Sequence, residues 1–353
     1  MSELIKTIFK VDNRPADPLQ VLATRYDPPP ALNYVRRDNG YTLVFLHATG
    51  MHKETWEVTI ERLYKLAASS QKFFIQDIFS IECPNHGESA VLNQEALKKY
   101  FENNWPTREY SRAAHAFLNA GRSRGAMVDF SKRTLIGIGH SSGVPALCLM
   151  REYSPRIQFS AIIAIEPGLS EMKTRNNPRA DVVRQVMSAW TWLKKDTWAS
   201  SDTARKELKA SQPQASWDPR ILNLYLKYAL RIHPAASFPP PFNFNGLTTA
   251  LTKEQEAASY RSDDLLDLGL EAYSIITREI PVHVVWATMS EVAPPVLQEV
   301  LEDRSLGRCP ASVTRIEGAG HLMVQQAPDY VAEVLSILLS RIASDHSAFS
   351  SRL

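Results

Sequence analysis

One stretch decides the fold: Leu135-Ile136-Gly137-Ile138-Gly139-His140-Ser141-Ser142-Gly143-Val144-Pro145-Ala146-Leu147. It reads as a buried strand, a Gly-x-Ser-x-Gly turn and an apolar helix, the context in which this motif marks a nucleophilic serine. A serine in so tight a turn needs small residues two positions before and after it, and Gly139 and Gly143 supply them. The sequence therefore predicts that Ser141 is a nucleophile between a strand and a helix N-terminus, which favours negative charge at the reacting carbonyl.

Apolar, β-rich runs recur on both sides of this turn and alternate with helical patterns. Most of these runs are continuously apolar, as expected for strands buried on both faces of a parallel sheet. The expected strands are 41–46, 74–81, 133–138, 161–165, 282–286 and 312–316. A closing helix is expected after Pro328, because apolar residues then recur with a helical period. The sequence predicts an α/β fold with a mostly parallel central sheet and helices on both faces.

A long insertion separates the strand that ends near Ile165 from the strand that begins near Val282. It has no clear β run, but it contains helical stretches at 182–194 and 221–230. Since unstructured loops of that length are rare in compact domains, we expect a helical lid. The expected division is a core over 1–168, a lid over 169–279, a second core part over 280–342 and a flexible tail over 343–353.

His321 is the candidate general base. In the fold that carries this elbow, the nucleophile, the acid and the histidine follow one another along the chain. His321 comes after the last expected strand and before the final helix, flanked by glycines, where a loop can carry an imidazole back over the elbow. His140 is expected to have a structural role, because a base adjacent in sequence could not reach around the turn.

Two glutamates compete for the role of the acid that orients the imidazole. Glu291 follows the strand at 282–286, after which this fold commonly holds its acid, but Ser290 occupies the expected register. Glu166 stands directly at the end of the strand at 161–165. A carboxylate at a buried strand end needs a partner to offset its desolvation. Glu166 is the preferred acid and Glu291 the alternative.

The segment His47–Glu54 follows the first expected core strand and matches the loop that supplies an oxyanion donor in this fold. We expect the backbone N–H groups of Thr49 and Ser142 to form the oxyanion hole, with Gly50 or Met51 as near alternatives to Thr49. A second loop, Glu82–Ser89, is expected to stabilise the first without taking part in the chemistry.

Together these motifs resemble a fungal family of peroxisomal α/β-hydrolases, which includes lipases, hydrolases of polyketide toxin pathways and an acyl-CoA hydrolase of secondary metabolism. The resemblance spans nearly the whole chain, and its most specific parts are the lid segments 216–220 and 227–231. It implies the α/β-hydrolase fold and an acid after the earlier strand, hence Glu166. The chain departs from the family pattern at Ala48, usually a glycine, and at 288–290 after Trp286.

Composition limits the classes of partner. The 353 residues are 44% apolar and 22% charged, with a formal charge of +2. This balance gives no reason to expect nucleic acid or an anionic membrane as the main partner. Three widely spaced cysteines and no apolar run of about 18 residues favour a soluble intracellular protein without a membrane span. The sequence indicates no metal site and no cofactor.

The last three residues, Ser351, Arg352 and Leu353, have the order of a C-terminal peroxisomal address. Such a tripeptide is read by the peroxisomal import receptor, so it must be exposed. The sequence thus predicts a peroxisomal enzyme with the import receptor as a protein partner.

The sequence-based hypothesis is a serine hydrolase that cleaves an acyl thioester, such as an acyl-CoA, or an ester through an acyl-enzyme. The alternatives are a carboxylesterase or lipase, a lyase or cyclase on the same fold, and a non-catalytic ligand-binding protein. Four aromatic side chains could line an acyl pocket, and four basic ones could meet the phosphates of coenzyme A. They are Trp190, Trp192, Tyr225 and Phe242, and Lys173, Arg175, Arg179 and Arg184.

Overall fold

The computed structural model describes residues 3–169, 178–262 and 264–350. Within these residues, the main sheet has eight strands in the order β1-β2-β4-β3-β5-β6-β10-β11. All pairs from β4 to β11 are parallel, and only β1 and β2 run antiparallel to their neighbours. The strands are β1 (Ile5–Asp12), β2 (Gln20–Asp27), β3 (Tyr41–Leu46), β4 (Ile75–Ile81), β5 (Thr134–His140), β6 (Phe159–Ile165), β10 (Val282–Ala287) and β11 (Ser312–Ile316). The predicted mostly parallel sheet is confirmed.

The strands β3, β4 and β10 are buried at every residue, which explains why β3 and β10 are almost entirely apolar. β4 also buries the polar residues Gln76, Asp77 and Ser80. The hairpin of β1 and β2 was not predicted. In β1, exposed Ile5 and Ile8 stand among lysines, and only Phe9 and Val11 are buried. An edge strand with one open side gives a weaker apolar pattern than a central strand.

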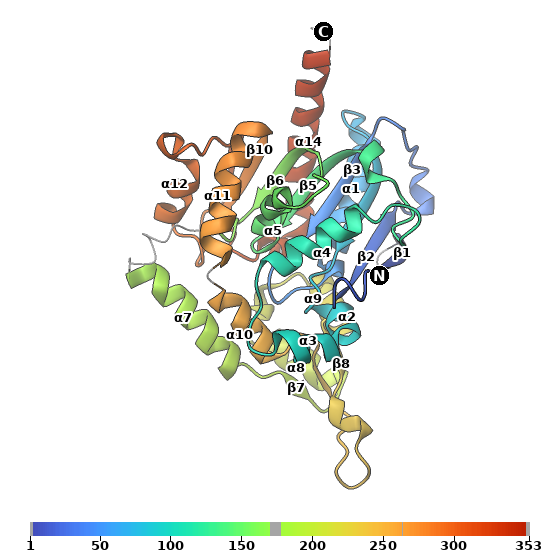
Figure 1. The fold of residues 1–353 in the computed structure, drawn as a ribbon, viewed down its shortest axis with the longest axis vertical. Helices are drawn as coiled ribbons and strands as arrows, with labels where there is room; N and C mark the ends of the chain where they lie inside the picture. Colours follow the sequence, from blue (N-terminus) through green and yellow to red (C-terminus); the bar gives the residue numbers. More distant parts are fainter. Residues whose placement is uncertain (1–2, 170–177, 263, 351–353) are drawn as a thin grey trace.

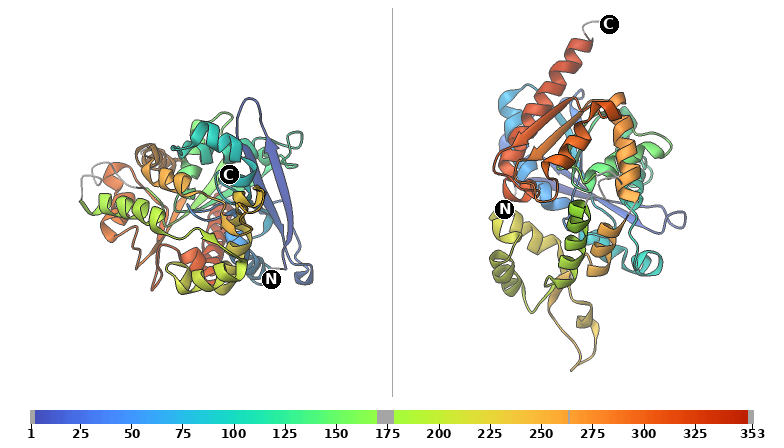
Figure 2. Two further views of the ribbon diagram at one scale, coloured as in Figure 1. Left: turned by 90° about the horizontal axis from the view of Figure 1, so that it is seen from below. Right: turned by 90° about the vertical axis from the view of Figure 1, so that its left-hand side faces the viewer.

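Helices cover both faces of the sheet (Figures 1 and 2). On one face, α1 (Glu57–Ser70) packs against α14 (Pro328–Ser350). On the other, α5 (Gly143–Leu149) packs against α4 (Arg108–Leu118) and α11 (Asp264–Glu279). The shorter helices of the core are α2 (Gly87–Leu92), α3 (Gln94–Phe101), α12 (Pro295–Glu302) and α13 (Met323–Gln326). The 3₁₀ turns are 30–32, 53–56, 130–132, 150–152, 214–216, 234–237 and 304–306.

The final helix begins at Pro328 as expected, but it continues to Ser350. Residues 343–350, which the sequence predicts to be part of a flexible tail, are helical in the structure. Ile342 is buried against the core, and Tyr41 Oη lies 3.2 Å from Nδ1 of His346, so core contacts support the helix beyond its predicted end.

The lid between β6 and β10 is mainly helical. Its helices are α7 (Pro178–Leu193), α8 (Ser201–Ala210), α9 (Pro219–Tyr228) and α10 (Lys253–Arg261). It also holds a small sheet of β7 (Thr197–Trp198), β9 (Leu247–Thr249) and β8 (Leu230–Ile232), in that order, whose strands are too short to leave a sequence pattern. Helix α11 contacts α5 of the core, so the chain has returned to the core before Val282.

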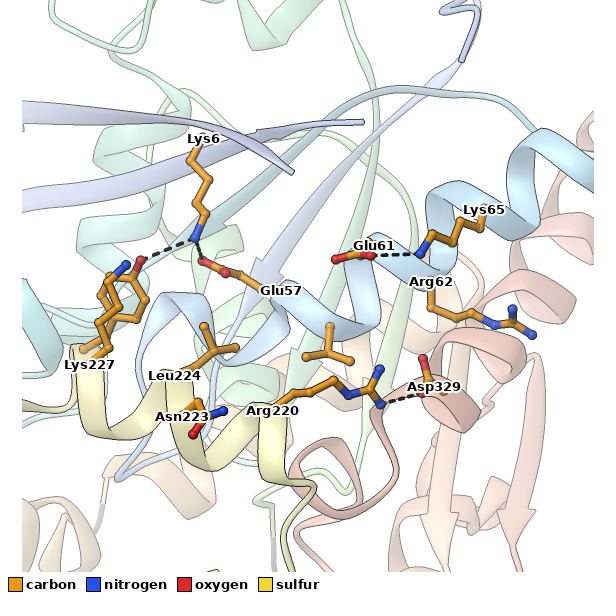
Figure 3. Close-up of a pocket in the computed structure, with 12 residues that line it drawn as sticks. Lys6, Glu57, Glu61, Arg62, Lys65, Arg220, Asn223, Leu224, Lys227 and Asp329 are labelled. Atoms are coloured by element: carbon orange, nitrogen blue, oxygen red, sulfur yellow. Dashed lines mark hydrogen bonds and ion pairs between the residues drawn. The ribbon is translucent and has the colours of Figure 1, made fainter. Parts of the chain in front are cut away.

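Charged side chains join lid helix α9 to the core around a pocket of about 610 Å³ between α9 and α1 (Figure 3). At one end, Lys6 Nζ donates hydrogen bonds to Glu57 at 2.6 Å and to Tyr228 Oη at 3.3 Å. At the other end, Arg220 forms an ion pair with Asp329 at the start of α14. These contacts fix the orientation of α9 over the core.

Candidate active site

The turn between β5 and α5 holds Ser141 in the left-handed region of backbone space, with φ of +51°. A Cβ atom on Gly139 would lie 2.8 Å from the carbonyl carbon of Gly143, and one on Gly143 would lie 2.4 Å from the carbonyl oxygen of Leu46. Both positions therefore require glycine for steric reasons, as the sequence predicts. The turn leaves Ser141 at the carboxyl edge of the sheet.

Glu166 directly follows β6, the strand next to β5 in the sheet. It too has a positive φ, of +46°. The register pairs His140 with Ile165, and the N–H of Ser141 donates to the carbonyl of Ile165 at 3.0 Å. The N–H of Gly168 in turn donates to the carbonyl of Ser141 at 3.1 Å. The two strand ends are thus held side by side.

His321 joins these two residues from the loop between β11 and α13. Its Nδ1 atom lies 2.9 Å from Oε2 of Glu166, and its Nε2 atom lies 3.0 Å from Oγ of Ser141. An ionised carboxylate accepts only, so Nδ1 carries the proton and Nε2 is free to accept one from the serine. The arrangement is a continuous hydrogen-bonded line from carboxylate to hydroxyl.

His140 forms a hydrogen bond to the backbone of the loop that carries His321. Its Nε2 donates to the backbone carbonyl of His321 at 2.9 Å. Burial lowers the pKa of His140 to about 3, so the ring is neutral. A neutral ring 5.4 Å from the ring of His321 adds no competing positive charge beside it. His140 has a structural role here and makes no direct contact with the serine hydroxyl.

Glu166 is fully buried, and donors surround its carboxylate. Oε1 accepts the N–H of Ala287 at 2.7 Å, and Oε2 accepts the hydroxyl of Ser290 as well as the imidazole N–H. These bonds offset the cost of burying the charge. Glu291 instead accepts the backbone N–H of His321 at 3.2 Å, so it contacts the loop and not the ring.

The predicted oxyanion residues lie next to each other. Thr49 Oγ1 donates to Ser142 Oγ at 3.1 Å, and both residues line a cavity of about 20 Å³, large enough for one water molecule. Within the described residues, neither the N–H of Thr49 nor that of Ser142 donates to another protein group. Both N–H groups are available to an acceptor from outside the chain.

A buried chain of hydrogen bonds connects this loop to the lid. The N–H of Gly50 donates to His86 Nε2 at 2.9 Å, and His86 Nδ1 donates to Asn85 Oδ1 at 2.6 Å. Asn85 Nδ2 then donates at 3.2 Å to Oε1 of Gln255, on lid helix α10. Burial holds the pKa of His86 well below its usual value, which keeps Nε2 an acceptor. We call Gly50, His86, Asn85 and Gln255 the loop–lid chain.

The loop–lid chain was only partly foreseen. The segment Glu82–Ser89 was expected to stabilise the oxyanion loop, and His86 does contact it. Gln255 was missed, because one glutamine in a helical lid has no distinguishing sequence signal. His47 supports the same loop, since its Nε2 accepts the N–H of Cys83 at 3.1 Å and burial lowers its pKa to about 3.

The loop 47–54 ends in a buried ammonium group. Lys53 Nζ contacts Glu54 at 2.8 Å, Glu88 at 2.6 Å and Glu82 at 3.4 Å. Burial alone would lower the pKa of Lys53, but the carboxylates outweigh it and raise the pKa. Glu82 also accepts the N–H of Ser89 at 2.9 Å, so the cluster joins the two loops.

The four aromatic residues predicted to line the acyl pocket differ in their environments, and two of them, Trp192 and Phe242, are exposed to solvent. Tyr225 is buried and stacks edge-on against Trp217 within the lid. Trp190 is half-buried under the ammonium group of Lys194, and Trp192 is 48% exposed. Phe242 is 75% exposed on the proline-rich turn after β8, so its assignment to an enclosed pocket was wrong.

The described residues contain no group of three or more His, Cys, Asp or Glu side chains placed to hold a metal ion. No helix within them is both long and apolar enough to cross a membrane. The side chains of Lys173, Arg175, Arg179 and Arg184 lie outside the described residues, as do Ser351, Arg352 and Leu353.

The chain belongs to the alpha/beta hydrolase family, whose profile matches residues 43–334. The matched range runs from β3 to α14 and includes the elbow, Glu166 and His321. The sheet order and the strand–turn–helix at Ser141 are those expected for this family.

Two fungal proteins are similar in sequence to parts of this chain. The chain is 23% identical over 202 residues to the type I acyl-CoA thioesterase mpaH' of Penicillium brevicompactum, covering 57% of this chain and 42% of that protein. It is 32% identical over 125 residues to the peroxisomal membrane protein LPX1 of Saccharomyces cerevisiae, covering 35% of this chain and 30% of that protein. The chain thus matches less than half of the length of either relative.

The crystal structure of the peroxisomal alpha-beta-hydrolase Lpx1 from Saccharomyces cerevisiae superimposes with a TM-score of 0.72. It is 18% identical and covers 96% of this chain and 89% of that one. This match shows the shared fold, and with the two relatives it confirms the predicted resemblance to fungal peroxisomal α/β-hydrolases.

Proposed function

We propose that this protein is a serine hydrolase that cleaves an acyl thioester or ester. The observation that carries the proposal is the hydrogen-bonded line from Glu166 through His321 to Ser141. Since Nε2 of His321 is the unprotonated nitrogen, it takes the hydroxyl proton as Ser141 attacks the acyl carbonyl. Glu166 keeps the ring in this tautomer and stabilises the imidazolium that forms.

The N–H groups of Thr49 and Ser142 stabilise the negative oxygen of the tetrahedral intermediate. The loop–lid chain keeps the Thr49–Gly50 backbone in place, because His86 fixes the orientation of the Gly50 peptide. Collapse of the intermediate expels a thiol or alcohol, which takes its proton from His321. Water, activated by the same imidazole, then releases the acid and regenerates Ser141.

An acyl-CoA is the preferred substrate class, and the relative named as an acyl-CoA thioesterase supports it. The tripeptide Ser351-Arg352-Leu353 supports a peroxisomal location and capture by the import receptor, as does the relative named as peroxisomal. In this setting a thioesterase of fungal secondary metabolism would release a free acid from acyl-CoA. A neutral ester is the competing substrate.

The test uses the full chain with a matched pair of substrates, an acyl-CoA and the methyl ester of the same acid. Wild type should label with a fluorophosphonate probe and hydrolyse the thioester faster. Ser141→Ala should lose both the labelling and at least about 1,000-fold in turnover. Ser69→Ala, an exposed serine on α1, is the matched control. Undiminished turnover in Ser141→Ala would refute the proposal, and faster methyl ester cleavage would assign an esterase instead.

A further inference from the structure

The segment that projects from the lid between β8 and β9 carries no charge. From Pro234 to Thr252 the chain has no acidic, basic or histidine side chain. Figures 1 and 2 show this segment as a narrow hairpin that extends away from the body of the protein, at the end opposite α14. Charged side chains are usually frequent on protein surfaces that face water, so this stretch is unusual.

The hairpin is a folded element. Strand β8 pairs with β9, and beyond the strands His233 N–H donates to Gly246 O at 2.9 Å. Phe244 N–H donates to Ala235 O at 3.1 Å, which closes the base of the loop. A side chain at Gly246 would collide with the ring of Phe244, 2.3 Å from the Cβ position, so this glycine permits the close approach.

Apolar side chains cover this hairpin and point to solvent. Phe242 is 75% exposed, Ile232 67%, Phe238 56% and Phe244 37%. Three prolines separate Phe238 from Phe242. Their fixed φ angles stiffen the tip of the hairpin, residues 238–244, and oppose a fold-back that would cover the rings. Clustered exposed apolar groups on a surface mark an interaction site.

The lack of charge and the projecting shape of the hairpin tip, residues 238–244, favour one kind of partner. At these exposures the four side chains offer roughly 400–500 Å² of apolar surface. A stable protein interface buries about 800 Å² from each partner and is surrounded by a polar rim. Residues 234–252 supply no charged side chain for such a rim. A convex, uncharged, aromatic tip fits the acyl–headgroup boundary of a phospholipid layer, where aromatic rings are enriched.

We propose that the hairpin 233–246 inserts into the surface of a phospholipid membrane and anchors the lid there. Insertion of Phe238 and Phe242 drives binding, and electrostatic attraction contributes little because residues 234–252 carry no acidic or basic side chain. Arg231 at its base is already engaged with Gln94 of α3. The inference is independent of the acyl chemistry at Ser141, since it concerns the outer face of the lid.

The experiment measures flotation of the full chain with neutral phosphatidylcholine vesicles at low and at 1 M salt. Wild type should bind, and salt should change the bound fraction less than twofold. The double variant Phe238→Asp/Phe242→Asp should lose more than tenfold in affinity. Val35→Asp, at an apolar residue that is 74% exposed and far along the chain, is the control and should bind as wild type does.

Three outcomes would overturn the proposal. They are no flotation of wild type, equal loss in Val35→Asp, or binding that disappears at 1 M salt. A dimer that the double variant dissociates, measured by light scattering without lipid, would assign the tip to a protein interface instead. Circular dichroism and Tm of the double variant show whether it is folded, and Phe238→Ser provides a milder second variant. Hydrolysis of a soluble acyl substrate should be unchanged in all of them.

Discussion

Ser290 donates a hydrogen bond to Glu166, and it stands where this fold commonly places the acid itself. In the proposed mechanism the carboxylate that orients the imidazole lies at the end of β6, and a serine hydroxyl occupies the common register after β10. The hydroxyl of Ser290 and Nδ1 of His321 both donate to Oε2 of Glu166, and β6 and β10 are neighbours in the sheet. The site thus offers two places from which a carboxylate could orient one imidazole.

Moving the acid tests this relationship. Glu166→Gln should lower kcat by about 100- to 10,000-fold, because the amide no longer fixes the imidazole tautomer. Adding Ser290→Asp should restore at least tenfold of that loss, since the new carboxylate lies beside the same ring. Steady-state kinetics on the preferred substrate checks both. Glu291→Gln should change kcat less than about fivefold, and a larger loss would make Glu291 the acid.

Breaking the loop–lid chain should lower kcat and leave KM nearly unchanged. Gln255→Ala removes the last link, so kcat should fall about 3- to 10-fold with KM nearly unchanged, because the oxyanion loop becomes less well ordered. His86→Phe should have a larger effect, since it leaves the Gly50 N–H without its acceptor. Gln158→Ala, at an exposed glutamine, is the matched control. A rise in KM alone would instead place Gln255 in substrate binding.

The buried ion pairs of Lys53 and the half-exposed ion pair of Arg220 should contribute differently to the free energy of unfolding. Lys53→Met leaves the carboxylates of Glu54 and Glu82 buried without their cation and should cost about 3–5 kcal/mol of unfolding free energy. Arg220→Ala removes a half-exposed pair with Asp329 and should cost less than about 1 kcal/mol. Urea denaturation at neutral pH measures both, and equal losses would contradict this reasoning.

Acid should destabilise the fold through its buried histidines. The pKa of His140 is lowered from its ordinary value of 6.5 to about 3 in the folded state, so between these values the unfolded chain binds the extra proton. Stability therefore rises with pH across this window, by up to about 1.4 kcal/mol per pH unit for one such group. His140→Gln keeps a donor for the His321 carbonyl and should flatten the slope of unfolding free energy between pH 6 and 4. An unchanged slope would mean that His140 titrates normally.

The central sheet and the elbow could be predicted from sequence because their signals are local. A strand buried on both faces is continuously apolar, and the glycines around Ser141 are required by steric contacts within a few residues. The choice of Glu166 over Glu291 was predicted from register and family resemblance. The structure places Glu166 on the ring, and the role of this residue as the acid remains our proposal.

Other features depend on contacts that a single sequence does not reveal. Gln255 meets Asn85 across 170 positions of the chain, and neither residue has a motif that indicates the other. The helix through Ser350 is supported by core contacts of Ile342 and His346. Phe242 was assigned to a pocket on its hydrophobicity alone, but the prolines before it direct it to solvent. In each case tertiary packing decided the outcome.

The positions of the three central residues along the chain also set the order in which the site can assemble. Ser141 and Glu166 lie on adjacent strands joined by a single short helix, so local folding alone can bring them together. His321 is 155 positions beyond Glu166 and reaches it only after the lid and two further strands have been made. During synthesis, a growing chain would therefore carry a serine without its base until almost the whole domain has folded.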